Sequence, residues 1–345
     1  MIRRIAVIAV IAVIALLAGS RSLATPNAVP SPVNSLLLAA LAAPATVSYA
    51  GVVQVLRVGD REAQASVYRI EHRAPALTRR VYTTPATLAG ETIVSRGDID
   101  FAIDPKRHRI VETRNDAIGD RVAFNDNFAL LRANYLASKR GEQDFDGRET
   151  VDVALTNKYS GQLTMMVRID RQSKLVLDKQ EFAPDGSLVS EVRFEEVRYA
   201  GAFPESDFAL PKAYPTIQGP RFGEPSKNPD VVVRSAGFAT REPKGLPEGF
   251  SPVEGNLVEI QGVRTLHLLY SDGIRSVSLF ENVNDSTIDM TRFHPQPTSI
   301  GGRQAQYAEI GAMELLAWSD GSLHYALVGD LELAELQRIA ASIAP

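Results

Sequence analysis

Short apolar runs separated by tight turns restrict the folds that this sequence can adopt. The clearest case is LHLLYSDGIRSVSLF at residues 266–280, where two such runs flank Asp272-Gly273. Glycine supplies the positive φ that a tight hairpin turn needs. A turn at these two residues would put six side chains on one face of an antiparallel sheet. The predicted pairs are Leu266 with Leu279, Leu268 with Val277, and Tyr270 with Arg275.

The same alternation of strand-like runs and turns extends over residues 50–197. Valine-rich runs flank Gly59-Asp60, and a later meander turns at Asp185-Gly186. We predict strands at 50–58, 65–72, 79–83, 91–95, 100–103, 109–113, 151–157, 162–169, 175–181 and 188–197. A second Ser-Asp-Gly turn at residues 319–321 predicts a hairpin between 313–318 and 323–328. These patterns predict antiparallel sheets.

Three segments have the apolar spacing of helices. Residues 34–43 are apolar almost all round, which predicts a helix buried against a sheet. The other two helices are expected at 125–138 and 331–343. Their apolar stripes are Phe128, Leu131 and Tyr135 in the first, and Leu333, Leu336, Ala340 and Ile343 in the second. The N-cap candidates are Asn34 or Ser35, Asn125 or Asn127, and Asp330, in chain order.

We therefore predict an α+β fold with two domains, as the length of 345 residues also suggests. Residues 34–210 would form a large antiparallel sheet with helices laid on it. Residues 231–345 would form a smaller α+β domain. Six prolines crowd residues 204–229, so we expect a stiff proline-rich linker over 211–230.

The N-terminal residues 1–24 have the features of a Sec-type signal peptide. Arg3 and Arg4 precede an apolar run over 5–18, and Ser22-Leu23-Ala24 offers a small-x-small cleavage site. An uncleaved anchor is the alternative, although the run is short for a membrane span. Residues 25–33 would be a tether. The sequence thus predicts export, and the absence of cysteine means that the domains must fold without disulfides.

Charge and motif content argue against several classes of function. The formal net charge of −4 would fall to −7 once the three arginines of the signal peptide were removed, which disfavours nucleic acid as a partner. The sequence contains no HExxH, GxSxG, P-loop or GxGxxG motif. Its five histidines are scattered, so we expect surface or partly buried imidazoles rather than metal ligands: His72, His108, His267, His294 and His324. We predict no cofactor and no enzyme activity.

Two clusters of charge remain open to a binding role. Asp98, Asp100 and Asp104 could hold calcium, but they lack EF-hand spacing and a solvated turn is favoured. The basic run Lys106-Arg107-His108-Arg109 could contact an acidic peptide or an anionic headgroup, although a solvated loop is favoured. Trp318, which precedes the second Ser-Asp-Gly turn, is either a partner anchor or a core residue.

The order and spacing of several stretches resemble the RseB/MucB family of periplasmic sigma-factor regulators. In the first domain these are VSYAGVVQV at 47–55, LLRANY at 130–135, FDGRETVDV at 145–153 and the long run from 168 to 197. In the second domain they are LPEGF at 246–250, LLYSDGIRSVSLFEN at 268–282 and LVGDLELAELQRIAASI at 327–343. Residues 71–114 follow the family only loosely.

The resemblance implies a half-open β-barrel with helices in the first domain, similar to the lipoprotein carriers LolA and LppX. It implies a protein that binds the periplasmic segment of a membrane-anchored anti-sigma factor and shields it from proteolysis. Lipid, lipopolysaccharide or lipoprotein acyl chains would compete and lift the shield. The alternatives are a lipid or lipoprotein carrier without a sigma-factor role and an exported hydrolase with a site assembled from distant residues.

Two sets of candidate site residues follow from these hypotheses. Apolar positions of the early strands and helix either line a lipid cavity or belong to a plain core: Val53, Val55, Val67, Phe101 and Leu131. The candidate residues for binding a protein partner lie in the second domain: Tyr270, Arg275 and Trp318.

Overall fold

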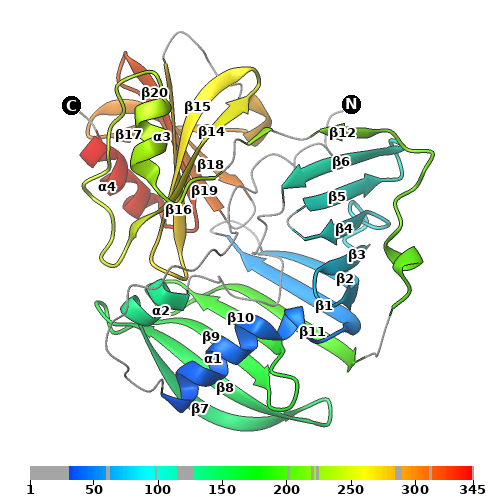
Figure 1. The fold of residues 1–345 in the computed structure, drawn as a ribbon. Helices are drawn as coiled ribbons and strands as arrows, with labels where there is room; N and C mark the ends of the chain where they lie inside the picture. The colour runs from blue at the N-terminus through cyan, green and yellow to red at the C-terminus, as the bar shows by residue number, and fades with distance from the viewer. Residues whose placement is uncertain are drawn as a thin grey trace. The chain divides into compact units, whose positions relative to one another are not determined.

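The computed structural model describes residues 31–59, 63–97, 99–114, 128–199, 203–218, 221–222, 225–283, 290–310 and 313–343. The chain divides into two compact units between Gln218 and Gly219 (Figure 1). The predicted signal peptide, the Gly59-Asp60 turn beyond Gly59, Asp98 and the cap candidates Asn125 and Asn127 lie outside the described residues. None of the helices in the described part of the chain is long and apolar enough to cross a membrane.

The first unit is built on an open twelve-stranded sheet with the order β12-β6-β5-β4-β3-β2-β1-β11-β10-β9-β8-β7. Its strands are β1 (Tyr49–Val58), β2 (Ala63–Arg73), β3 (Leu77–Thr84), β4 (Thr92–Arg96), β5 (Ile99–Asp104), β6 (Arg109–Arg114), β7 (Tyr135–Phe145), β8 (Arg148–Asn157), β9 (Leu163–Asp170), β10 (Val176–Phe182), β11 (Leu188–Tyr199) and β12 (Thr216–Gln218). Neighbouring strands are antiparallel except β12, which joins β6 in parallel. The predicted fold class is confirmed, and each predicted strand of this sheet is present.

Helix α1 (Pro32–Ala42) begins earlier than predicted and continues into the 3-10 helix η1 (Ala43–Ala45). The Oγ of Ser31 accepts a hydrogen bond from the backbone N–H of Asn34 at 3.2 Å. Ser31 is therefore the N-cap, and the predicted caps Asn34 and Ser35 are wrong. Pro32 suits the first turn because a proline there loses no helical hydrogen bond. Leu37 and Ala40 are buried, as expected for a helix laid on a sheet.

The helix predicted at 125–138 is shorter in the structure, where α2 covers Phe128–Asn134 and β7 begins at Tyr135. The Nζ of Lys158 donates to the carbonyl oxygens of Arg132 and Ala133, which closes the end of the helix. Tyr135 then pairs with Asn157 of β8. Pairing with β8 thus replaces a further helical turn, and the prediction missed strand β7.

The range 211–230, predicted as a linker, contains regular structure. The 3-10 helix η3 (Glu205–Phe208) precedes it, and β12 lies inside it. The two-residue strand β13 (Arg221–Phe222) pairs with β14, and α3 (Pro229–Ser235) follows. The prolines are compatible with β12 because Pro215 contributes a carbonyl oxygen, which accepts from Ile110 N–H at 2.9 Å.

The second unit contains an eight-stranded antiparallel sheet with the order β13-β14-β15-β16-β20-β19-β18-β17. Its remaining elements are β14 (Ser251–Ile260), β15 (Val263–Ser271), β16 (Ser276–Val283), η4 (Thr291–Phe293), β17 (Gln296–Ile300), β18 (Arg303–Ile310), β19 (Met313–Ser319), β20 (Leu323–Gly329) and α4 (Leu333–Ile343). Residues of α3 and α4 join one sheet face in a common hydrophobic core. Helix α4 begins at Leu333, and Leu336 N–H donates to the carbonyl oxygen of Glu332 at 3.0 Å, so Glu332 rather than the predicted Asp330 is at the cap position. Asp330 accepts from Ser276 N–H at 2.8 Å.

The hairpin at 266–280 has the predicted faces but a different register. Leu268 pairs with Leu279, Tyr270 with Val277, and Ser271 with Ser276. The turn therefore spans Asp272 to Arg275, and every predicted pair is displaced by two residues. A two-residue shift keeps each side chain on its face because the side-chain period of a strand is two.

Candidate functional site

One face of the first sheet carries a cluster of buried aromatic and aliphatic side chains, which we call the aromatic face. It is formed by Tyr49, Val53, Val55, Tyr68, Ile70, Tyr82, Leu177, Val192, Phe194 and Val197. The rings of Tyr68 and Tyr82 lie 5.4 Å apart, and Phe194 meets Tyr49 edge-on at 5.7 Å. Strand alternation places these residues together because Val53 pairs with both Tyr68 and Phe194.

His72 holds the segment that precedes β1 against this face. Its ring stacks on Tyr49 at 4.8 Å, its Nε2 lies 2.7 Å from the carbonyl oxygen of Pro44, and its Nδ1 lies 2.9 Å from Thr78 Oγ1. Because the carbonyl can only accept, Nε2 donates to it and Nδ1 accepts from the hydroxyl in the neutral ring. The sequence predicted a surface or partly buried imidazole, but His72 is only 4% exposed and packs within the fold.

Two ion pairs lie on the same face, and both members of the first are buried. The Nη2 of Arg80 lies 3.3 Å from Asp100 Oδ2, with the two side chains 2% and 10% exposed. Burial alone would lower the pKa of Arg80, but Tyr82 and Asp100 outweigh it and raise the pKa above its ordinary value. Arg80 pairs with Ile70 in the sheet register, so this charge points into the apolar face. A buried charge of this kind is stable only when it is paired.

The second pair joins Lys179 and Glu181 of β10 at 3.1 Å. The hydroxyl of Ser190 donates to the other oxygen of Glu181 at 2.7 Å. Burial would raise the pKa of Glu181, but Lys179 and the Ser190 hydrogen bond outweigh it, so the pKa lies below its usual value. The aromatic face thus combines apolar packing with one buried ion pair and a second pair in which Lys179 is buried and Glu181 is 32% exposed.

The opposite face of these strands is polar. Arg168 donates from Nε to Asp152 at 2.8 Å and lies 3.7 Å from Asp178. Burial and the neighbouring Glu191 raise the pKa of Asp178 to about 6, against the opposing effect of Arg168. The sheet is therefore one-sided in this region, as the alternation of its sequence indicates.

The five candidate cavity residues do not form one cluster. Val53 and Val55 lie on the aromatic face, 0% and 2% exposed. Val67 pairs with Gln54 and lies on the opposite face. Phe101 pairs with the buried Val94 on that same opposite face, with the Arg96 guanidinium 5.5 Å from its ring centre. Leu131 is buried on α2.

The acidic cluster of the sequence has a structural explanation in its described members. Asp100 pairs with Arg80, and Asp104 accepts from the backbone N–H groups of Lys106 and Arg107 at 3.1 and 3.0 Å. Asp104 thus caps a turn, which is the interpretation that the sequence favoured. In the part of the chain that the structure describes, no group of three or more His, Cys, Asp or Glu residues could hold a metal ion.

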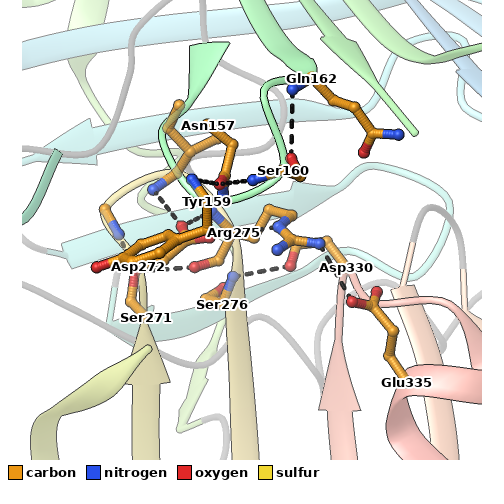
Figure 2. A network of polar contacts seen from close by, with 12 residues as sticks. Asn157, Tyr159, Ser160, Gln162, Ser271, Asp272, Arg275, Ser276, Asp330 and Glu335 are labelled. Carbon is orange, nitrogen blue, oxygen red and sulfur yellow. Dashed lines mark hydrogen bonds and ion pairs between the residues drawn. The ribbon is translucent and has the colours of Figure 1, made fainter. Parts of the chain in front are cut away.

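A polar network surrounds the hairpin turn of the second unit (Figure 2). Asp272 Oδ1 accepts from Ile274 and Arg275 N–H at 3.0 and 2.8 Å. The Arg275 guanidinium lies 3.3 Å from Asp272 Oδ2 and 3.4 Å from Glu335 of α4. These ion pairs connect the turn to α4.

Figure 2 also shows the turn of the first unit at Asn157, whose Oδ1 accepts from Tyr159 N–H at 2.8 Å.

A second cluster lies on the core face of the same sheet, around Asp320. The ring of Trp318 stacks on Tyr325 at 5.1 Å, and the Tyr325 hydroxyl donates to Asp320 at 2.9 Å. Arg241 Nε lies 3.5 Å from Asp320, while its backbone N–H lies 3.3 Å from each oxygen of the buried Glu281. Burial raises the pKa of Glu281 to about 7, against the effect of Arg241.

The three candidate partner residues have different environments. Tyr270 and Trp318 are 5% and 6% exposed and belong to the hydrophobic core of the second unit. Arg275 is partly exposed and forms ion pairs with Asp272 and Glu335. The structure thus places two of the three in the core, which was the alternative interpretation of Trp318.

The buried charges were not predicted, although strand alternation carried a signal for them. Lys179 and Glu181 follow Leu177 at two-residue intervals in β10, and Leu177 lies on the aromatic face. Arg80 has the same parity as Tyr82 in β3. A charged residue at an inward position of a strand is the pattern that would have identified them.

The fold is that of a two-unit β protein in which a large open sheet precedes a smaller sheet with helices on one face. No protein-family model matches the sequence, and no curated protein matches it. Among solved structures, MucB has a similar fold. MucB in complex with MucA(peri) has a TM-score of 0.61 at 17% identity, covering 91% of this chain and 98% of that chain.

Two further structures agree with this match. The MucA/MucB complex of Pseudomonas aeruginosa has a TM-score of 0.62 at 17% identity and covers 91% of this chain and 99% of that chain. MucB alone has a TM-score of 0.54 at 18% identity, covering 92% and 99%. At such identities the likeness shows the fold, so the chain has a MucB-like fold.

Proposed function

We propose that this chain is an extracytoplasmic regulator that binds the exposed segment of a membrane-anchored anti-sigma factor and protects it from proteolysis. The observation that carries the proposal is the extent of the likeness to MucB. That likeness covers both units, and the MucB structures include complexes with the periplasmic part of MucA. A carrier of the LolA kind would need the first unit alone, so the second unit favours the regulator.

The proposal assigns lipid sensing to the first unit. Val53 and Val55 on the aromatic face are its candidate contacts with acyl chains, and both are fully packed in this structure. Entry of an acyl chain therefore requires the side chains of the aromatic face to separate. A lipid can release the partner only if it binds the partner-free form more tightly, because equal affinity for both forms shifts nothing.

The proposal is tested with the purified extracytoplasmic segment of any single-span membrane protein that is encoded near this gene together with a sigma factor. We expect binding by calorimetry at micromolar concentrations and slower cleavage of the segment by a site-specific protease. Absence of binding at tens of micromolar would refute the proposal.

The carrier alternative makes a different prediction in the same assay. A carrier would co-purify with lipid, as native mass spectrometry would show, and would leave the cleavage rate of the segment unchanged. For the regulator, added lipid with acyl chains should restore cleavage, whereas the same headgroup without acyl chains should not.

A further inference from the structure

The free edge of β6 receives a strand from a distant part of the same chain. Residues Thr216, Ile217 and Gln218 of β12 pair in parallel with Ile110, Val111 and Glu112. An unpaired strand edge is a template for any extended segment, and proteins commonly bind peptides in this way. Here the chain itself occupies the template.

Strand β12 is held weakly. Its three residues are all exposed, with Ile217 at 41%, so its side chains bury little apolar surface. Parallel pairing is slightly less stable per residue than antiparallel pairing. The upstream segment is fixed independently, because Phe208 is 1% exposed and its carbonyl oxygen accepts from Arg96 at 3.0 Å. Strand β12 can therefore leave the edge without unfolding the unit.

The charge at this edge favours another occupant. The basic run that the sequence singled out leads directly into β6, and His108 packs its ring 5.3 Å from that of Tyr214, just before β12. Lys106 and Arg107 are exposed there, and Asp104 pairs with Arg107 at 2.9 Å. The occupying segment brings a further cation, Lys212, two residues before Tyr214. An acidic residue at that position would complement the basic run better.

We propose that the β6 edge is a strand-exchange site, which β12 occupies until an extended partner segment with acidic residues at its N-terminal end displaces it. The natural identity of that partner rests on the proposed function, whereas the exchange itself does not. Displacement would also free residues 209–218 and so lengthen the connection between the two units.

The absence of cysteine from the chain allows a direct test with a disulfide. Val111→Cys with Ile217→Cys joins two residues that are paired in the register of β6 and β12. The matched control, Val81→Cys with Thr92→Cys, joins β3 to β4, which stay paired in both states. The full chain is used for both variants, oxidised and then reduced.

The first probe is a synthetic peptide copying residues 211–218, PKAYPTIQ, and the same peptide with Lys212→Glu. We expect the acidic peptide to bind more tightly than the native one, with a difference that shrinks at high salt. Oxidation of the β6–β12 cysteine pair, which we call the staple, should weaken the binding of both peptides by at least about tenfold. Reduction of the disulfide should restore their binding. Equal binding to the oxidised and reduced protein would overturn the proposal.

An opposite variant loosens β12. Ile217→Pro removes the backbone N–H of residue 217 and should strengthen binding of the acidic peptide, whereas the control Ile217→Thr keeps the backbone and should not. If Ile217→Pro instead produces dimers and no gain in peptide binding, the edge accepts a second copy of this chain and the proposal fails.

The anti-sigma segment is the second probe and separates the two proposals. Both proposals stand if the segment binds and its affinity falls when the β6–β12 staple is oxidised but not when the control disulfide is oxidised. Equal affinity for the oxidised and reduced protein refutes exchange for this partner and leaves the proposed function intact. If the segment does not bind any form, the proposed function fails, and the peptide results alone decide whether exchange occurs.

Discussion

The two units keep titratable groups inside their sheets in different ways. The first unit buries charges in ion pairs, Arg80 with Asp100, and Lys179 with a Glu181 side chain that is 32% exposed. The second unit buries His267 and Glu281, and burial shifts the pKa of each toward its neutral form. A buried pair is expensive to break, whereas a buried neutral group is expensive to ionise. Substitution should therefore reveal the first way, through Arg80 and Asp100, and pH the second, through His267 and Glu281.

His267 illustrates the second way. Its Nδ1 lies 2.7 Å from Asn256 Oδ1 and its ring stacks on Phe280 at 4.6 Å, with the residue 0% exposed. Burial lowers its pKa to about 3. The stability that this neutral histidine contributes is present above the unfolded pKa of about 6.5 and is lost as the pH falls below it.

The largest expected effect comes from breaking a pair in the first unit. Asp100→Ala leaves Arg80 charged and buried without this partner, and should lower the free energy of unfolding of the first unit by about 3–5 kcal/mol. Hydrogen exchange of the β3 to β5 amides measures it. The chain's one tryptophan, Trp318, lies in the second unit, so its fluorescence transition should not move.

The matched control for that substitution replaces both members of the pair. Arg80→Met with Asp100→Leu should recover most of the lost stability, because no charge then remains buried. If the double variant is as unstable as Asp100→Ala, the loss reflects packing rather than an unpaired charge.

The next effect tests the second unit through Glu281. Its folded pKa of about 7 lies above the usual 4.5, so its stabilising effect is present below pH 4.5 and is lost as the pH rises toward 7. Between pH 4.5 and 7 this ionisation lowers the free energy of unfolding by about 3 kcal/mol, and Glu281→Gln should abolish that decrease. Urea unfolding followed by Trp318 fluorescence should then show stability rising from pH 4.5 to 6.5, since the effect of His267 remains. A flat profile would contradict this assignment.

His267 should give the opposite profile in the same assay. His267→Gln cannot ionise, so it removes the loss of stability below pH 6.5 and leaves the effect of Glu281. Stability should then fall by about 2 kcal/mol as the pH rises from 5 to 6.5. In the unsubstituted chain the two effects oppose each other between pH 4.5 and 6.5, and we expect a nearly level profile there.

The smallest effect belongs to a neighbour of Arg80 on the other face of β3. Arg79 pairs with Glu71 at 3.3 Å, but the two side chains are 37% and 30% exposed. Arg79→Ala should change the free energy of unfolding by about 0.5 kcal/mol or less, because water screens an exposed pair. A loss as large as that of Asp100→Ala would show that burial does not explain the difference between the pairs.

Strand alternation and turn residues were enough to predict the fold class, ten strands of the first sheet and four of the second, but not β12, β13, β14, β17 or β18. They did not determine register at the 266–280 hairpin, because Asp272 can cap a longer turn through its carboxylate instead of entering a two-residue one. They also missed β7, since residues 135–138 continue the helical spacing of Phe128 and Leu131. Pairing with β8 decided their conformation, and such tertiary pairing is not visible in a local window.

The candidate sites were less predictable than the fold. Val53 and Val67 look alike in sequence but lie on opposite faces, and the faces follow only from the pairing of β1 with β2. Tyr270 and Trp318 resemble partner anchors in sequence, but α4 and the sheet enclose them in a core. The buried ion pairs depend on contacts between strands that a single sequence does not display.

The spacing of β12 and β13 has a consequence for how this chain can change in evolution. Connections between domains usually accept inserted residues at little cost. Here β12 ends at Gln218 on one sheet and β13 begins at Arg221 on the other. An insertion of one residue inside β12 would shift the residues that follow it out of register with β6, so length variation should be rarer here than in ordinary interdomain segments.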